Sequence, residues 1–135
     1  MTSTWETFVS DNLLDSNLFS GVCLLSNQRD VIFSHGSLTK LSQAEIDQFF
    51  QSFSCGETDP CYRSFHLSAG KAQGSESYKI YYRTHISLYA TSAGNRSGLT
   101  VSKLEQGIFL TLFHKPVLPQ RAISVVERFT GMLRF

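Results

Sequence analysis

The chain has 135 residues, of which 41% are apolar and 17% are charged, and its formal net charge is +1. This length fits a single domain over residues 1–135, and the composition is too apolar for a disordered chain. The near-neutral charge excludes binding driven mainly by bulk charge, so nucleic acid is not an expected partner.

The first part of the chain combines one helix pattern with a strand hairpin. Ser3 and Glu6 form a capping-box pattern, and the apolar residues after them predict an amphipathic helix over residues 4–14. A nearly continuous apolar run over residues 19–25 predicts a strand covered on both faces. After a polar turn, residues 31–33 start the returning strand of a hairpin.

The rest of the chain predicts a helix, a strand meander and a last helix. A second capping box, at Ser42 and Glu45, precedes an apolar stripe at helical spacing. Polar turns then separate five short strand candidates, the last two joined tightly enough to be antiparallel neighbours. They are residues 64–68, 78–83, 86–91, 99–103 and 108–113. Pro119 lies where a final helix could start, so the order indicates an α+β fold with one antiparallel sheet.

The sequence shows no set of residues typical of catalysis or of metal binding. There are three cysteines, Cys23, Cys55 and Cys61. Because their number is odd and the sequence shows no signal-peptide pattern, we expect reduced thiols in the cytoplasm. His66 with two nearby cysteines is an incomplete zinc pattern. No phosphate-binding loop or nucleophile–base pair is visible, so no metal, no cofactor and no enzymatic activity are expected.

The two ends of the chain carry aromatic residues whose role the pattern leaves open. Trp5 lies in the first turn of the first predicted helix, and Phe135 follows the last one. Trp5 could simply belong to the core. Alternatively, the two terminal helices could lie side by side and expose an aromatic patch, a surface that suits polyproline helices.

Several segments in a fixed order resemble the profilin family. They are T-W-E-T-F-V at the start, L-S-Q-A-E-I at 41–46, L-S-A-G-K at 67–71, L-T-V-S-K at 99–103, K-P-V-L-P at 115–119 and V-V-E-R at 125–128. Their order and spacing cover nearly the whole chain, which is similar to a divergent member of the family.

The resemblance implies both a fold and a function. The expected fold is an antiparallel sheet of about seven strands, with the terminal helices on one face and smaller helices on the other. Profilins bind monomeric actin, regulate its polymerisation and nucleotide exchange, deliver it to proline-rich elongation factors and bind phosphoinositides. A cytoplasmic, cytoskeleton-associated, non-enzymatic protein is therefore expected.

The resemblance places the actin face on the C-terminal helix and neighbouring strands. The implied residues are Tyr62, Lys71, Arg96, Pro119, Arg121, Ile123 and Glu127. Lys71 and Arg121 could meet acidic groups of actin, and Glu127 could accept a hydrogen bond. The family commonly has a basic residue in place of Ile123 and glycine in place of Gln120, so altered affinity is expected.

The implied polyproline site departs further from the family. Its residues are Trp5, Phe8, Ile32, Met132 and Phe135. Ile32 falls where the family has a second Trp, and Phe135 stands near the place of a final Tyr. Because Ile and Phe lack the N–H or O–H groups that hydrogen-bond to proline carbonyls, weakened binding of proline-rich peptides is expected.

The resemblance also implies phosphoinositide binding, and two alternative functions stay open. The candidate lipid-binding residues are Arg96, Lys103, Arg121, Arg128 and Arg134, although a solvated mixed surface would show the same residues. One alternative is a profilin-like adaptor or lipid-binding domain with little actin activity. The other is a small-GTPase adaptor of the longin or roadblock kind, which also combines helices with one antiparallel sheet.

Overall fold

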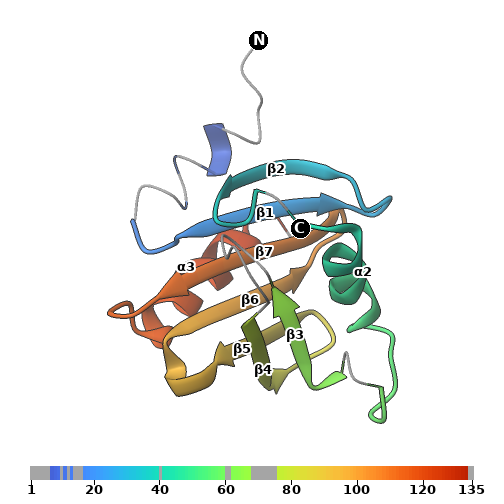
Figure 1. Cartoon of the computed structure of the whole chain (residues 1–135). Helices are drawn as coiled ribbons and strands as arrows, with labels where there is room; N and C mark the ends of the chain where they lie inside the picture. Colours follow the sequence, from blue (N-terminus) through green and yellow to red (C-terminus); the bar gives the residue numbers. More distant parts are fainter. Residues whose placement is uncertain are drawn as a thin grey trace.

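Seven strands form one sheet in the order β2-β1-β7-β6-β5-β4-β3, and all neighbours are antiparallel (Figure 1). The computed structural model describes residues 7–9, 11, 13, 17–39, 41–59, 62–67 and 76–133. The strands are β1 (Gly21–Ser26), β2 (Val31–Gly36), β3 (Ser64–Leu67), β4 (Glu76–Arg83), β5 (Ser87–Ser92), β6 (Ser97–Lys103) and β7 (Gly107–His114). The predicted α+β fold with a single antiparallel sheet is confirmed.

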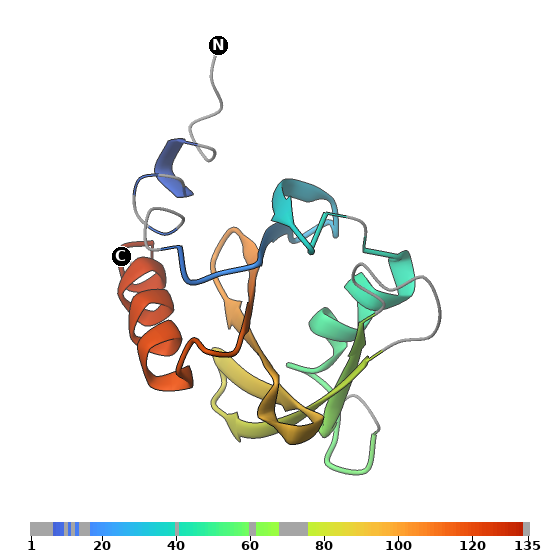
Figure 2. The ribbon, with the colours of Figure 1, turned by 60° about the vertical axis from the view of Figure 1, so that its left-hand side comes forward.

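Helices cover both faces of this sheet, as expected. Figure 2 shows α3 (Pro119–Gly131) on one side of the sheet and α2 (Gln43–Gln51) on the other. Residues 7–9 and 11 are helical, and Val9 packs in the same apolar cluster as Phe129 of α3. None of the described helices is long and apolar enough to cross a membrane.

Strand β1 shows how one sheet supports two apolar cores. Cys23 and Leu25 point into the core beneath α2. Val22 and Leu24 point into the core shared by the N-terminal segment and α3. Successive side chains of a strand alternate between faces, so the apolar run satisfies both cores at once. The strand is covered on both faces, as predicted.

The predicted helix starts are confirmed at the level of individual hydrogen bonds. The Glu45 backbone N–H donates to Ser42 Oγ at 3.1 Å, and the Ser42 backbone N–H donates to Glu45 Oε1 at 2.8 Å, which completes a capping box. Pro119 is the first residue of α3, where its missing N–H costs nothing. The predicted apolar stripe comprises Ile46, Phe49, Phe50 and Phe53; Phe53 lies beyond the end of α2, yet it still packs against the core.

Strand β4 begins earlier than its apolar pattern predicts. Glu76 and Ser77 pair with Leu67 and His66 of β3, so backbone hydrogen bonding extends the strand into polar residues. The apolar pattern indicates which strand residues are buried, whereas the hydrogen bonds between paired strands involve only the backbone and can include polar residues.

Candidate binding surfaces on the α3 side of the sheet

An apolar groove of about 820 Å³ lies between the sheet and the N-terminal end of α3. Strands β4, β5 and β6 contribute residues to it, as do β7, the loop after it and the first turns of α3. Arg96, Pro119 and Ile123, all predicted for an actin face, line this groove. The fold therefore brings these three positions together from two separate parts of the chain.

The floor of the groove depends on a glycine beneath an aromatic ring. Gly98 of β6 is paired with Phe113 of β7, and both line the groove. A Cβ atom on Gly98 would lie 2.2 Å from Cζ of Phe113. Because glycine has no Cβ, the Phe113 ring lies across β6 and forms an apolar floor.

The loop from β7 into α3 forms an apolar rim beside this floor. Its Lys115–Pro116 peptide bond is cis, and the Lys115 backbone N–H donates to the Arg96 carbonyl oxygen at 3.0 Å. Leu118, immediately before α3, is 65% exposed. A large apolar side chain presented this openly on a hydrogen-bonded loop is available to a partner.

Positively charged side chains lie at the groove. Arg96 and Lys115 line it, and both are exposed; no Asp or Glu is among the described residues that line it. Arg121 is exposed in the first turn of α3. An apolar floor with a cationic rim fits an acidic protein surface that carries an apolar side chain.

Three tyrosines beside the groove, Tyr81, Tyr82 and Tyr89, form what we call the tyrosine shelf. Tyr82 and Tyr89 are stacked, with ring centroids 4.9 Å apart and an interplanar angle of 11°, and the Tyr81 centroid lies 6.4 Å from that of Tyr89. The pairing of β4 with β5 shifts register between Ile80 and Tyr82. This bulge lets two consecutive tyrosines face the same side of the sheet.

The sequence interpretation overlooked this shelf, although a signal was present. Tyr81 and Tyr82 are adjacent large aromatics in a strand, which breaks the alternation expected of a half-buried strand. A bulge is the usual way in which a sheet accommodates such a pair.

Glu127 of α3, predicted to contact actin, is hydrogen-bonded within the protein. Its Oε2 atom accepts a hydrogen bond from the Tyr89 hydroxyl and another from Ser87 Oγ at 3.2 Å. Burial and then this carboxylate raise the pKa of Tyr89 well above its usual value, because both disfavour the phenolate. The network ties α3 to β5.

Tyr62 lies in a smaller hollow of about 280 Å³ that shares Tyr81 with the groove. The Arg83 guanidinium lies 3.9 Å from the Tyr62 ring centroid and donates to the carbonyl oxygens of Tyr62 and Ser52, each at 2.6 Å. Tyr62 is therefore fixed next to the tyrosine shelf. Lys71, the remaining predicted actin residue, lies outside the described residues.

A second aromatic cluster lies at the other end of α3, where Phe8 and Phe33 are partly exposed and Phe109 and Phe129 are buried. Phe8 packs against Phe129 at a centroid distance of 5.2 Å, and Phe129 stacks on Phe109 at 4.9 Å. Phe33 of β2 packs against the same cluster. We call Phe8, Phe33, Phe109 and Phe129 the aromatic platform.

Phe33 is the β2 residue that packs in this platform, and the predicted Ile32 beside it is exposed. Pairing of β1 with β2 matches Leu24 with Phe33 and Leu25 with Val31, so Ile32 is the unpaired residue of a bulge. Phe33 consequently shares the face of Leu24, in the core beneath α3.

Of the other predicted polyproline residues, one lies at the end of α3 and two lie outside the residues that the structure describes. Met132, the residue after α3, is exposed. Trp5 and Phe135 lie outside the described residues.

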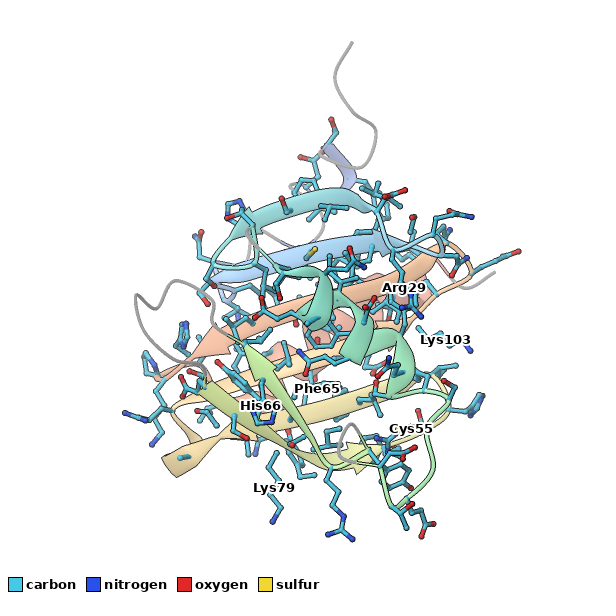
Figure 3. All side chains as sticks on the ribbon, turned by 45° about the vertical axis from the view of Figure 1, so that its right-hand side comes forward. Arg29, Cys55, Phe65, His66, Lys79 and Lys103 are labelled. Atoms are coloured by element: carbon cyan, nitrogen blue, oxygen red, sulfur yellow. The ribbon has the colours of Figure 1, made fainter. Side chains whose placement is uncertain are left out.

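The residues predicted for phosphoinositide binding are distributed over both faces of the sheet. Arg121 and Arg128 are exposed on α3, and Arg96 lines the groove. The Lys103 ammonium, in contrast, lies 6.0 Å from the ring centroid of Phe53 on the α2 side (Figure 3). Arg134 lies outside the described residues.

The α2 side carries a polar hollow of about 580 Å³ that includes Cys55 and His66 (Figure 3). Gln48 holds the backbone of His66 there: its Nε2 donates to the His66 carbonyl at 2.7 Å, and its Oε1 accepts from the His66 N–H at 2.9 Å. In the part of the chain that the structure describes, no group of three or more His, Cys, Asp or Glu side chains could hold a metal ion.

Solved structures of profilins share this fold. Acanthamoeba castellanii profilin II matches with a TM-score of 0.77 at 19% identity, over 96% of this chain and 96% of that one. The LokiProfilin1 complex with rabbit actin matches with a TM-score of 0.74 at 14% identity, over 98% and 96%. Mouse profilin IIa in complex with a double repeat from the FH1 domain of mDia1 matches with a TM-score of 0.65 at 12% identity, over 98% and 97%.

Sequence comparisons agree with the structural ones. Drosophila melanogaster profilin is 22% identical over 125 residues, which are 93% of this chain and 91% of that protein. The profilin family model matches residues 3–135. The chain is therefore a member of the profilin family.

Proposed function

We propose that this profilin binds monomeric actin through the groove at the N-terminal end of α3 and thereby regulates actin polymerisation. The observation that carries the proposal is the apolar floor of the groove beneath a cationic rim. A profilin of the same fold has been solved with rabbit actin, which supports the choice of partner. Membership of the profilin family removes the longin and roadblock alternative.

The groove could hold an actin monomer by two effects. Burial of an apolar side chain against Phe113 and Ile123 would supply most of the affinity, at roughly 25 cal/mol per Å² of apolar surface removed from water. Arg96 and Arg121, which are exposed, would act chiefly on the association rate and on orientation. Binding of this kind requires no catalysis and is expected in the cytoplasm, where actin monomers occur.

The test is the assembly of pyrene-labelled actin at several concentrations of this protein. We expect slower spontaneous nucleation and a changed rate of nucleotide exchange on the monomer. Wild-type protein that alters neither rate would contradict the proposal.

Charge reversal on the groove rim makes the test specific to this surface. Arg96→Glu with Arg121→Glu should weaken actin binding about tenfold or more at low salt, less at high salt, because rim charges steer association. Lys103→Glu, on the α2 side, is the control and should bind actin within about twofold of wild type. An equal loss in the control would place the contact elsewhere.

We further propose weak binding of proline-rich peptides at the aromatic platform. Phe8 and Phe33 are its partly exposed rings, above the buried Phe109 and Phe129, so these two can stack on proline but offer no side-chain donor. A profilin of the same fold has been solved with a proline-rich partner's FH1 repeat, which supports the class of ligand. Titration with proline-rich peptides, followed by the fluorescence of the chain's single Trp, tests this. Affinity equal to that of a conventional profilin would contradict it.

A substitution that adds a donor tests which β2 residue faces the peptide. Phe33→Trp should strengthen binding of a labelled proline-rich peptide severalfold, because the indole N–H can donate to a proline carbonyl. Val31→Trp is the matched control and should change affinity little, because Val31 is paired with Leu25, which faces the core beneath α2. A larger gain from Val31→Trp would contradict the assignment.

Phosphoinositide lipids have no part in this proposal. Lys103 lies on the α2 side of the sheet, whereas Arg121 and Arg128 lie on α3. A lipid headgroup needs several cations within one patch.

A further inference from the structure

Exposed apolar side chains gather around the groove. Tyr81 and Tyr82 are 54% and 48% exposed, and with Leu118 they are three of the six large apolar residues that are exposed among those described. Tyr81 and Leu118 both line the groove, and Tyr82 stacks beside them on Tyr89. The tyrosine shelf thus continues the apolar surface of the groove onto β4.

The shelf is held rigidly, although its outer faces are open. Tyr89 is stacked with Tyr82 and lies at a tilted angle beside Tyr81, and its hydroxyl is bonded to Glu127 of α3. The same carboxylate oxygen accepts from Ser87 Oγ, so β5 and α3 fix the central ring together. Aromatic side chains that are already ordered lose little conformational entropy when a partner binds.

We propose that the tyrosine shelf is an anchor for the actin monomer, and that Glu127 is a positioning residue that acts through Tyr89. This rests on the actin binding proposed above. Tyrosine is enriched among the few residues that dominate the affinity of protein interfaces, particularly at the edge of a desolvated pocket. The shelf would receive an apolar side chain of actin, while the carboxylate of Glu127 stays bonded to Tyr89.

The first test measures the affinity of the full-length chain for monomeric actin. Tyr81→Ala and Tyr82→Ala should each weaken binding about tenfold or more with the melting temperature little changed, since both side chains are about half exposed. Val31→Ala, at 49% exposure on the opposite edge of the sheet, is the matched control and should bind like wild type.

The second test separates positioning from direct contact. Glu127→Ala should weaken actin binding, whereas Glu127→Gln should retain most of it, because an amide oxygen still accepts from the Tyr89 hydroxyl. Tyr89→Phe should weaken binding as Glu127→Ala does, and the double variant should be little worse than either single one.

The outcomes are distinguishable. Wild-type protein that fails to bind actin would overturn the proposed function itself. Wild-type binding together with unchanged affinity in Tyr81→Ala and Tyr82→Ala would overturn only the role of the shelf. An equal loss in Glu127→Gln and Glu127→Ala, or additive losses in the double variant, would show that Glu127 contacts actin directly.

Discussion

Burial determines the chemistry of individual side chains in this protein, and Cys23 is the clearest case. Cys23 lies in β1 with no exposed surface, and burial raises the pKa of its thiol to about 12. The apolar surroundings exclude the thiolate, so this cysteine behaves as a small apolar residue. Tyr89 shows the same effect beside the groove, where burial and a carboxylate both favour the neutral phenol.

The raised pKa of Cys23 predicts a loss of stability at alkaline pH. The unfolded thiol ionises near its ordinary value, whereas the folded thiol keeps its proton until about pH 12. The stabilisation is therefore complete at neutral pH and falls as the pH rises above about 9, by at most about 1.4 kcal/mol per pH unit.

Urea unfolding of wild type and Cys23→Ala from pH 7 to pH 10.5 measures this contribution. The variant should be less stable at pH 7, because it leaves a small cavity, but its stability should fall less steeply above pH 9. Cys55→Ala, at a partly exposed position, should follow the wild-type slope. Parallel curves for wild type and Cys23→Ala would refute the prediction.

At the scale of elements, small side chains on β6 allow the α3 face to form. Three small residues of β6 are paired with residues of β7 and share their face of the sheet. The pairs are Gly98 with Phe113, Thr100 with Thr111 and Ser102 with Phe109. Bulges in β2 and β4 then decide which aromatic side chains reach this face. The close packing at β6 and the side-chain directions set by the two bulges together produce the groove, the tyrosine shelf and the aromatic platform.

Gly98→Ala tests the importance of close packing at β6. The added Cβ atom would meet the Phe113 ring at 2.2 Å, so the ring must move toward the groove. We expect the free energy of unfolding to fall by about 1–3 kcal/mol and actin binding to weaken as the groove narrows.

Gly56→Ala is the matched control, since a Cβ atom there has no neighbour within 4 Å. It should leave both the stability and the affinity for actin unchanged. If Gly98→Ala keeps the melting temperature and the actin affinity of the wild type, the Phe113 ring adapts to the added Cβ atom without cost.

Across the whole molecule, the proposed actin and proline-peptide surfaces share one face of the sheet but lie at opposite ends of α3. Ile123 lines the groove near the start of the helix, and Phe129 belongs to the platform near its end. The two positions are six residues apart, which corresponds to about 9 Å along the helix axis. Because no platform residue lines the groove, both partners should be able to bind at once.

Simultaneous binding is measurable by titrating a labelled proline-rich peptide with and without saturating monomeric actin. We expect the two peptide affinities to agree within about twofold, since neither ligand removes the other's contacts. Competition between peptide and actin would show that the surfaces overlap.

The sequence by itself determined the elements and the family. Capping boxes and apolar periodicity are local properties, so Ser42, Pro119 and the strands of the meander were predictable to within a few residues. Family-specific segments were recognisable because they keep their order along the chain.

Only the tertiary structure decided which side chains meet. Two bulges shifted the register, which places Phe33 on the face of Leu24 in the aromatic platform and turns Tyr81 and Tyr82 to one face. Glu127 was predicted to accept a hydrogen bond in the actin face, and the packing of α3 on β5 places its carboxylate on Tyr89, which no local pattern predicts. Register and helix docking depend on residues distant in the chain, and a local pattern does not contain that information.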